Sequence, residues 1–268
     1  MTVPQWATCD LPSEPDYVSP GGVSEIRLLP SFPDGELAHA RTLPEHVSTA
    51  AVLTRITEFF YILAGHGELW RGSGEVEELV ELVPRRCASI PPGVHFQYRA
   101  GPEALQFIVC SAPRWERKDW NEAPRAYWPG RERESVGPGS AAPWATVDLR
   151  DQFDRHAPDG SEIRFLPEVD AGGLAHCTLP PRTTSRAMRH RTVNEVWYVL
   201  EGEGDLWRAT GDDEERVRLL PGRASTIPVG TSFQFRATAA RALRILIGTF
   251  PRWPEGETEA EPVHPHWR

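Results

Sequence analysis

Two glutamates and one histidine are the strongest candidates for chemistry in this sequence. His190 lies five residues before Glu195, and Glu195 precedes the bulky apolar run 196–198. Glu58 precedes a similar run at 59–61. A carboxyl group held among apolar side chains has a raised pKa and can exchange protons near neutral pH as a general acid or base. We predict His190, Glu195 and Glu58 as catalytic residues; the alternative is that each glutamate only hydrogen-bonds the backbone or a buried arginine.

The two glutamates occupy equivalent positions in an internal duplication. Matching segments follow one another in the same order: Trp6-Ala7-Thr8 with Trp144-Ala145-Thr146, Ser24-Glu25-Ile26-Arg27 with Ser161-Glu162-Ile163-Arg164, and Pro113-Arg114-Trp115 with Pro251-Arg252-Trp253. Agreement in order over this length indicates a duplicated domain. We predict one domain at 1–115, a Pro- and Gly-rich linker at 116–143, a second domain at 144–253, and a tail at 254–268 with little to bury.

The elements that must position these residues are short strands. The apolar run at 195–200 ends at the turn sequence Glu-Gly-Glu-Gly, which is typical of a strand followed by a turn. Phe233 and Phe235 alternate with polar residues, as do Phe96 and Tyr98 in the first copy, which indicates strands with one face on a core. We therefore predict an all-β protein built of sandwiches or closed barrels.

The motifs on these strands resemble those of the cupin family. Cupins carry a first motif, roughly G-x5-H-x-H-x3-4-E-x6-G, and a second, G-x5-P-x-G-x2-H-x3-N. The matching residues are His190, Glu195, Gly202, Gly222, Pro228 and Gly230 in the second copy, and Glu58, Gly65, Pro91 and Gly93 in the first. The resemblance implies a bicupin, with two tandem double-stranded β-helix (jelly-roll) barrels and a pocket at each barrel mouth.

Most metal ligands that the resemblance implies are replaced. The four ligand positions read Ala51, Leu53, Glu58 and Phe96 in the first copy, and Met188, His190, Glu195 and Phe233 in the second. One imidazole and one carboxylate are too few for a tight site. We expect no metal in the first copy and no cofactor overall. The alternative is one divalent metal in the second copy, bound by His176, His190 and Glu195.

The resemblance also implies a pocket lined by aromatic and histidine side chains. The predicted substrate-binding residues are His176, Trp197, Phe233 and Phe235 in the second copy, and His39, Phe60, Phe96 and Tyr98 in the first. The alternative is that the aromatic rings fill the barrels and that His39 and His176 are hydrogen-bonded structural residues. Most of the arginines that recur in both copies, a set that includes Arg71 and Arg208, are expected to form surface ion pairs, and an inward one would suggest an anionic substrate.

Composition excludes several classes of partner. The net charge of -9 offers no basic patch for nucleic acid or an anionic membrane. No apolar run approaches the roughly 20 residues of a membrane span, and no signal peptide is evident, so we expect a cytoplasmic protein. The four cysteines lack a paired motif and are expected to be reduced and buried. Two fused barrels predict a monomer with pseudo-two-fold symmetry or a homodimer.

Three functions remain open. The first is an enzyme that acts on a small organic substrate without a metal, as an isomerase, lyase or cyclase, with proton transfer by Glu195, His190 and Glu58. The second is a metal-dependent bicupin dioxygenase or decarboxylase with an atypical ligand set. The third is a non-catalytic bicupin that binds a small molecule. Fold analogy does not choose among them; the sequence favours the first, and it favours the second copy as its location.

Overall fold

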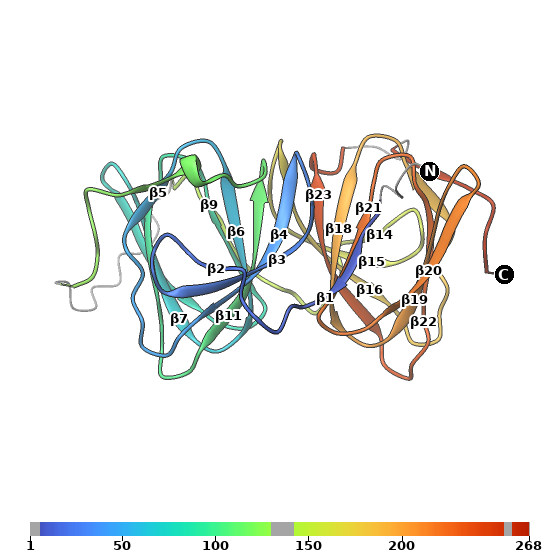
Figure 1. Ribbon diagram of the computed structural model, residues 1–268, viewed down its shortest axis with the longest axis horizontal. Coiled ribbons are helices and arrows are strands. Elements are labelled where there is room, and N and C mark those ends of the chain that lie inside the picture. Colours follow the sequence, from blue (N-terminus) through green and yellow to red (C-terminus); the bar gives the residue numbers. More distant parts are fainter. Residues whose placement is uncertain (1–5, 130–141, 255–258, 268) are drawn as a thin grey trace. The chain divides into compact units, whose positions relative to one another are not determined.

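The computed structural model of the protein describes residues 6–129, 142–254 and 259–267 (Figure 1). Within these ranges the secondary structure consists of β-strands and one 3-10 helix, η1 (Arg117–Asp119). The all-β prediction is therefore confirmed. In the same ranges no helix has the length and apolar character needed to cross a bilayer.

The first barrel is built from two antiparallel sheets. A seven-stranded sheet has the order β13-β9-β6-β11-β4-β3-β2, and a five-stranded sheet has the order β12-β5-β10-β7-β8. The strands are β2 (Tyr17–Val18), β3 (Ser24–Phe32), β4 (Gly35–Thr42), β5 (Ala51–Leu53), β6 (Thr57–Ala64), β7 (Gly67–Ser73), β8 (Val76–Leu82), β9 (Arg86–Ile90), β10 (His95–Ala100), β11 (Leu105–Ala112), β12 (Trp120–Glu122) and β13 (Thr146–Asp148).

The second barrel repeats this arrangement strand for strand. Its sheets have the orders β1-β21-β18-β23-β16-β15-β14 and β20-β19-β22-β17-β24. The strands are β1 (Thr8–Asp10), β14 (Arg155–His156), β15 (Glu162–Val169), β16 (Gly172–Leu179), β17 (Met188–His190), β18 (Asn194–Glu201), β19 (Gly204–Thr210), β20 (Asp213–Leu219), β21 (Arg223–Ile227), β22 (Ser232–Ala237), β23 (Leu243–Phe250) and β24 (Ala260–Pro262). Two tandem double-stranded β-helix barrels, as predicted, account for the duplication.

The first strand of each repeat joins the barrel formed by the other repeat. Strand β1 pairs with β21, with Thr8 opposite Ser225, and β13 pairs with β9, with Thr146 opposite Ala88. The two compact units are consequently discontinuous along the chain: one comprises Met1–Leu11, Leu29–Glu36 and Arg150–Arg268, and the other comprises Pro12–Leu28 and Leu37–Leu149. These units differ from the predicted continuous domains, because a repeat identifies equivalent segments without showing which barrel each one joins.

A buried arginine binds each of the two strands, β1 and β13, that join the barrel formed by the other repeat. Arg208 on β19 donates hydrogen bonds to the backbone oxygens of Ala7 (3.1 Å) and Thr226 (2.6 Å) and to Oγ1 of Thr8 (2.7 Å), and it pairs with Glu215. Arg71 makes the equivalent contacts in the first barrel, with Ser89, Ala145, Thr146 and Glu78. Both arginines are fully buried, so the expectation of surface ion pairs is wrong for them. Each links the five-stranded sheet to the edge of the seven-stranded sheet.

The segments predicted as linker and tail also complete the barrels. Strand β12, at the start of the predicted linker, pairs with β5, and β24 pairs with β17. The buried side chain of Gln234 accepts hydrogen bonds from the backbone N–H groups of His266 and Trp267, both at 2.8 Å. Glu259 and Ala260 are buried as well. The prediction that 254–268 has little to bury is therefore wrong in the part of this segment that the structure describes.

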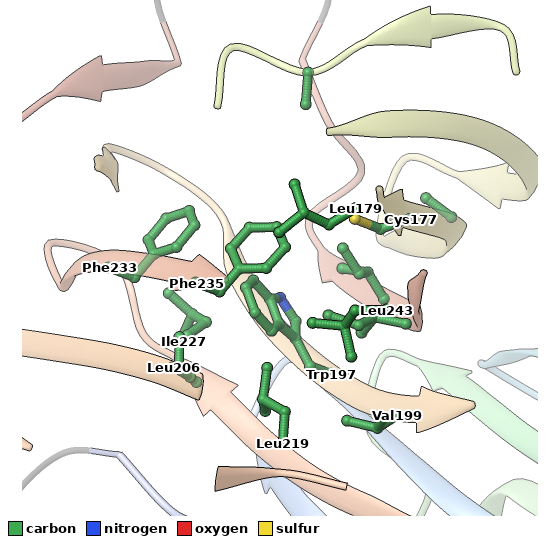
Figure 2. Close-up of a cluster of buried hydrophobic side chains, with 14 of the residues drawn as sticks. Cys177, Leu179, Trp197, Val199, Leu206, Leu219, Ile227, Phe233, Phe235 and Leu243 are labelled. Carbon is green, nitrogen blue, oxygen red and sulfur yellow. The ribbon is translucent and has the colours of Figure 1, made fainter. Parts of the chain in front are cut away.

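Alternation along the strands fills each barrel with apolar side chains. Figure 2 shows Trp197 in the middle of the second core, with the ring of Phe235 beside its indole. The centroids of these two rings are 4.9 Å apart. Phe233 lies on the same strand and also contacts Trp197, at 5.8 Å. In the first barrel Phe60, Phe96, Tyr98 and Phe107 pack against one another in the corresponding place. In the second barrel, Trp197, Phe233 and Phe235 line a cavity together with the polar residues described below.

Candidate functional site

A small cavity in the second barrel brings polar side chains together with the aromatic core. Its walls include His190, Glu195, Trp197, Phe233 and Trp253. The space open to the centre of a water-sized sphere is about 10 Å³, which is close to the minimum needed to hold one water molecule. The barrel interior is thus almost filled in this conformation.

Glu195 enters this cavity because of its place on β18. Side chains two residues apart on a strand share a face, so Glu195 and Trp197 both point into the barrel. The indole Nε1–H of Trp197 donates to Oε2 of Glu195 at 2.7 Å, and that of Trp253 donates to Oε1 at 3.1 Å. Glu195 is only 1% exposed. Two indole donors therefore hold a buried carboxylate at a fixed position.

His190 ends β17 and lies beside this carboxylate. Its Nε2 is 3.4 Å from Oε1 of Glu195, close enough for charge attraction, although no well-aligned hydrogen bond forms. The ring of Phe233 stacks on the imidazole at a centroid distance of 5.1 Å, and the ring of Trp253 packs edge-on at 5.5 Å. The imidazole is in contact with both rings and is 1% exposed.

A second carboxylate, from Glu259, holds the other edge of the imidazole. Oε2 of Glu259 is 2.6 Å from Nδ1 of His190. Its Oε1 accepts hydrogen bonds from the backbone N–H groups of Arg191, Thr192 and Val193, at 3.1, 3.2 and 3.2 Å. These three groups form the turn between β17 and β18. Glu259 therefore fixes both the imidazole and the backbone that leads to Glu195.

The electrostatics of the cluster favour a charged imidazole. Burial alone would lower the pKa of His190, but the negative charges of Glu195 and Glu259 and their contacts with the ring outweigh it and raise the pKa to about 10. Burial opposes the ionisation of Glu259 too, yet its hydrogen bonds with His190 and the backbone lower its pKa overall. The raised pKa keeps the proton of His190 on the ring at neutral pH, and the imidazole lies between the carboxyl groups of Glu195 and Glu259.

A third acidic residue, Asp159, lies on another part of the cavity wall together with Ser161. Oδ1 of Asp159 accepts hydrogen bonds from the backbone N–H (2.8 Å) and the hydroxyl (2.7 Å) of Ser161. Burial raises the pKa of Asp159 in spite of these bonds, and the charge of Glu195 raises it further. The cavity thus has carboxyl groups in two different environments.

The structure brings some of the predicted site residues together in one cavity. His190, Glu195, Trp197, Phe233 and Phe235 all line the one cavity. Their roles as catalytic or substrate-binding residues stay predictions, since the geometry places them without showing a substrate.

His176 and His39 do not join the sites predicted for them. On β16, Ala175 and Cys177 belong to the barrel core, so His176 between them points to the opposite face of its strand. On β4, His39 alternates in the same way with core residues on either side of it. Burial, followed by the charge of Arg27, lowers the pKa of His39 to about 4. The prediction that these histidines line the pockets is wrong, because both side chains face away from the cores.

Glu58 in the first barrel has different surroundings from Glu195. It lies at the same place on β6 but is only half-buried. The residue two positions on is Phe60, whose side chain has no N–H to donate, and Leu53 fills the place of His190. The first barrel therefore lacks the imidazole-carboxylate pair at these positions, and a catalytic role for Glu58 stays a prediction.

The side chains that the structure describes do not by themselves complete a metal site. His176 points away from the cavity, and no group of three or more His, Cys, Asp or Glu side chains in the described parts of the chain is arranged to hold one. Met188 and Phe233 lie directly opposite each other on β17 and β22, at two positions where cupins carry histidines. Glu195 and Glu259 are at opposite edges of the His190 ring, so one ion cannot contact all three groups. The predicted ligand set of His176, His190 and Glu195 is wrong.

Sequence reasoning missed Trp253, Glu259 and Asp159. Trp253 ends the matching Pro-Arg-Trp segment, but a repeat does not show where a side chain points. Glu259 lies in a Glu- and Pro-rich stretch whose composition is typical of a solvent-exposed segment. Asp159 lies two residues before the repeated Ser161 and has Gly22 as its counterpart in the first copy. The signal available for Asp159 is that the two copies differ at this position within a turn where they otherwise match.

Comparisons with known proteins agree with this fold. Residues 175–248 match the family model of the Cupin domain. An uncharacterized protein of Methanocaldococcus jannaschii is 28% identical over 120 residues, which are 41% of this chain and 93% of that protein. Oxalate decarboxylase from Bacillus subtilis has a TM-score of 0.72 at 11% identity, covering 96% of this chain and 78% of that one. A deletion mutant of that enzyme has a TM-score of 0.70 at 10% identity, covering 96% and 79%.

The sequence match and the fold likeness cover different parts of the chain. Residues 175–248, in the second repeat, are similar to the Cupin domain, and the fold of two tandem barrels is shared with oxalate decarboxylase over 96% of this chain. A likeness at 11% identity establishes the fold; the reaction has to be argued from the site.

Proposed function

We propose that the second barrel is a proton-transfer site for a small organic substrate, of the kind used by isomerases, lyases and cyclases. The observation that carries the proposal is the buried pair of His190 and Glu195, which are 3.4 Å apart at the wall of a cavity lined mainly by apolar side chains. Buried, closely paired titratable groups are costly to maintain and are enriched at functional sites. Structural ion pairs also occur in cores, so an exchange experiment has to separate the two roles.

In this proposal Glu195 takes a proton from carbon next to a carbonyl group and returns it at another position. Its two indole donors, from Trp197 and Trp253, keep the carboxylate oriented toward the cavity. His190 acts as a charged donor and not as a base, because its pKa of about 10 keeps it protonated at neutral pH. A positive charge beside the carbonyl oxygen favours the enolate that proton removal creates.

Access to Glu195 requires movement of a side chain, because the cavity has room for about one water molecule. Trp253 is the cavity aromatic that is only partly buried, and it is held by a single hydrogen bond to Glu195. A substrate that displaces this indole can occupy the space it leaves and can hydrogen-bond to Oε1 of Glu195, the atom that the indole bound. Such a substrate is small, has an apolar body and carries one donor or carbonyl group.

Hydrogen exchange at carbon tests the proposal even when the product is unidentified. Small carbonyl compounds and organic acids are incubated with the protein in deuterated water, and deuterium incorporation is read by mass spectrometry. We expect incorporation with some compounds, and its loss with Glu195→Gln. The matched control is Glu201→Gln on the same strand, where Glu201 is exposed and paired with Arg244. Exchange that persists with Glu195→Gln contradicts the proposal.

A metal-dependent decarboxylase or dioxygenase is the second candidate. It is favoured by the likeness of the whole chain to oxalate decarboxylase and by the retention of His190 and Glu195 at two cupin ligand positions. Elemental analysis of protein purified without chelator separates the two candidates. A transition metal at close to one equivalent per chain, lost in His190→Gln, supports the second candidate and contradicts the first.

A further inference from the structure

We propose that Glu259, from the segment that adds a strand at the end of the chain, is a positioning residue that holds His190 in the orientation needed at the site. The inference rests on the proposed function for its catalytic meaning, while the positioning itself is a structural claim that can be tested alone. Glu259 lies outside both cupin motifs and in a segment without the apolar pattern of a strand.

The geometry leaves His190 one orientation. Nδ1 faces Oε2 of Glu259 at 2.6 Å, so the ionised carboxylate accepts a hydrogen bond from a protonated Nδ1. Nε2 then faces Glu195 and the cavity. Turning the ring over would break the Nδ1 bond inside a site that is closed to water. An orienting carboxylate on the far nitrogen of a working histidine is the arrangement found in catalytic triads.

Glu259 is itself held rigidly. Its second oxygen accepts three backbone hydrogen bonds from the turn at 191–193, and the next residue, Ala260, pairs with His190 in the β17–β24 ladder. A carboxylate fixed by backbone donors cannot follow a ring that moves away. Its position therefore decides the position of the imidazole.

The first barrel shows that the added strand does not by itself require an imidazole partner. Asp119 precedes β12 as Glu259 precedes β24, and β12 pairs with β5 in the same register. Asp119 binds the guanidinium of Arg55, at 3.1 and 2.9 Å, and Leu53 stands where the second barrel has His190. In each barrel an acidic residue ties the added strand to the neighbouring turn. Only the second barrel, among the described residues, directs that carboxylate onto a histidine that also faces a glutamate.

The groups that face His190 limit the alternatives. The titratable ones are Glu195 from β18, Glu259 from the added segment and Asp159 from the turn before β15. Phe233 stacks on the ring, Trp253 packs against it edge-on, and neither side chain carries a charge. Of these groups, Glu259 is the one at hydrogen-bonding distance from Nδ1. Replacing Glu259 therefore removes the carboxylate that holds that edge of the ring.

Nuclear magnetic resonance of protein labelled with 15N in its histidines tests the positioning. We expect a downfield Nδ1–H proton signal, protected from exchange with water, which His190→Asn removes and thereby assigns. Glu259→Gln should shift this signal upfield or broaden it. Glu261→Gln is the matched control, since Glu261 lies on the same strand but pairs at the surface with Arg189 and Arg191; it should leave the signal unchanged.

Each outcome is decisive. A wild-type His190 without a proton on Nδ1 overturns the positioning even if Glu259→Gln fails to fold, and so does an unchanged signal in a folded Glu259→Gln. In the deuterium assay we expect Glu259→Gln to lower kcat about 10-fold, less than the roughly 100-fold or larger loss expected when a general acid–base group is itself removed, with KM little changed. A confirmed Nδ1 bond in a protein without any exchange activity overturns the proposed function and leaves the positioning standing.

Discussion

Arg208 donates a hydrogen bond to the backbone oxygen of Ala7 across 201 positions of sequence, at 3.1 Å. The same guanidinium reaches Thr226 on β21, so one buried side chain joins the first residues of the chain to the second barrel. The repeated Trp-Ala-Thr segment marks this strand, and its copy at 144–146 meets Arg71 in the same way. The relationship explains why both arginine and tripeptide recur in the sequence.

Arg208→Met should destabilise the second barrel strongly. The substitution leaves the oxygens of Ala7 and Thr226 without their buried donor, and we expect a loss of about 2–4 kcal/mol in the free energy of unfolding. Urea denaturation followed by tryptophan fluorescence measures it. Arg218→Gln is the control, because Arg218 is exposed and its pairs with Glu203 and Asp205 should contribute less than about 1 kcal/mol. Equal losses in the two variants would contradict the role given to Arg208.

The stability of the protein should fall as the pH rises from about 7 to about 10. His190 has a pKa near 10 in the folded protein, against 6.5 for an ordinary histidine. The folded state therefore keeps a proton that the unfolded chain releases, and the stabilisation, complete below the ordinary pKa, is lost as the pH approaches the raised one. The slope from this one group is at most about 1.4 kcal/mol per pH unit.

His190→Gln should flatten this dependence, because glutamine has no proton to lose in the range. Urea unfolding at several pH values compares the wild type with the variant. The control is His266→Gln, whose imidazole is stacked on Trp207 outside the cavity and should leave the wild-type slope in place. Parallel curves for the wild type and His190→Gln would show that Glu195 and Glu259 do not hold a charged imidazole.

Sequence patterns are sufficient for the fold because duplication and alternation are local and repeated signals. The alternation of Phe233 and Phe235 identifies an inward strand face, and the motif that contains His190 and Glu195 identifies two residues that line one cavity. What the patterns cannot give is the pairing of distant segments. β1 and β24 are each three residues long and carry almost no periodicity, so their partners are decided by the edges that the barrels leave open.

The errors at the site have the same origin. The place of His176 before the motif suggests a ligand, but one residue of register decides which face of a strand a side chain occupies. Glu259 has the sequence surroundings of a solvated tail residue, and its burial depends on β24 reaching β17. Arginines usually lie at the surface, which is why Arg71 and Arg208 are mispredicted; backbone oxygens of the exchanged strands supply the acceptors that allow their burial.

Trp253→Ala should open the cavity of the second barrel. The substitution removes a partly buried indole that covers His190 and donates to Glu195, so small aromatic or carbonyl compounds should bind faster and more tightly. Stopped-flow binding and ligand-induced shifts of the melting temperature measure this. Trp197→Ala is the comparison: its indole is buried in the core, and its loss should cost about 3–5 kcal/mol instead of opening access. Slower binding to Trp253→Ala would show that the indole is not the barrier.

Restoring the absent donors should create a metal site, and this tests why the wild type does not fit one. Met188 and Phe233 are direct partners across β17 and β22 and are both buried, so Met188→His together with Phe233→His would place two imidazoles beside His190 and Glu195. Three histidines and one carboxylate suit a first-row transition metal. We expect Co2+ or Ni2+ to raise the melting temperature of this variant, by an amount equivalent to about 4 kcal/mol at 1,000 times Kd.

The matched control uses the same two strands and the opposite face. Arg189 and Ser232 are the neighbouring partners in the β17–β22 ladder, and their side chains point away from Met188 and Phe233 because alternation reverses direction. Arg189→His with Ser232→His should therefore show no stabilisation that depends on His190 and Glu195. If added metal stabilised wild type and both variants alike, the apolar pair would not be what keeps metal out. A gain confined to the inward variant would show that two substitutions in the core separate this barrel from a metal-binding one.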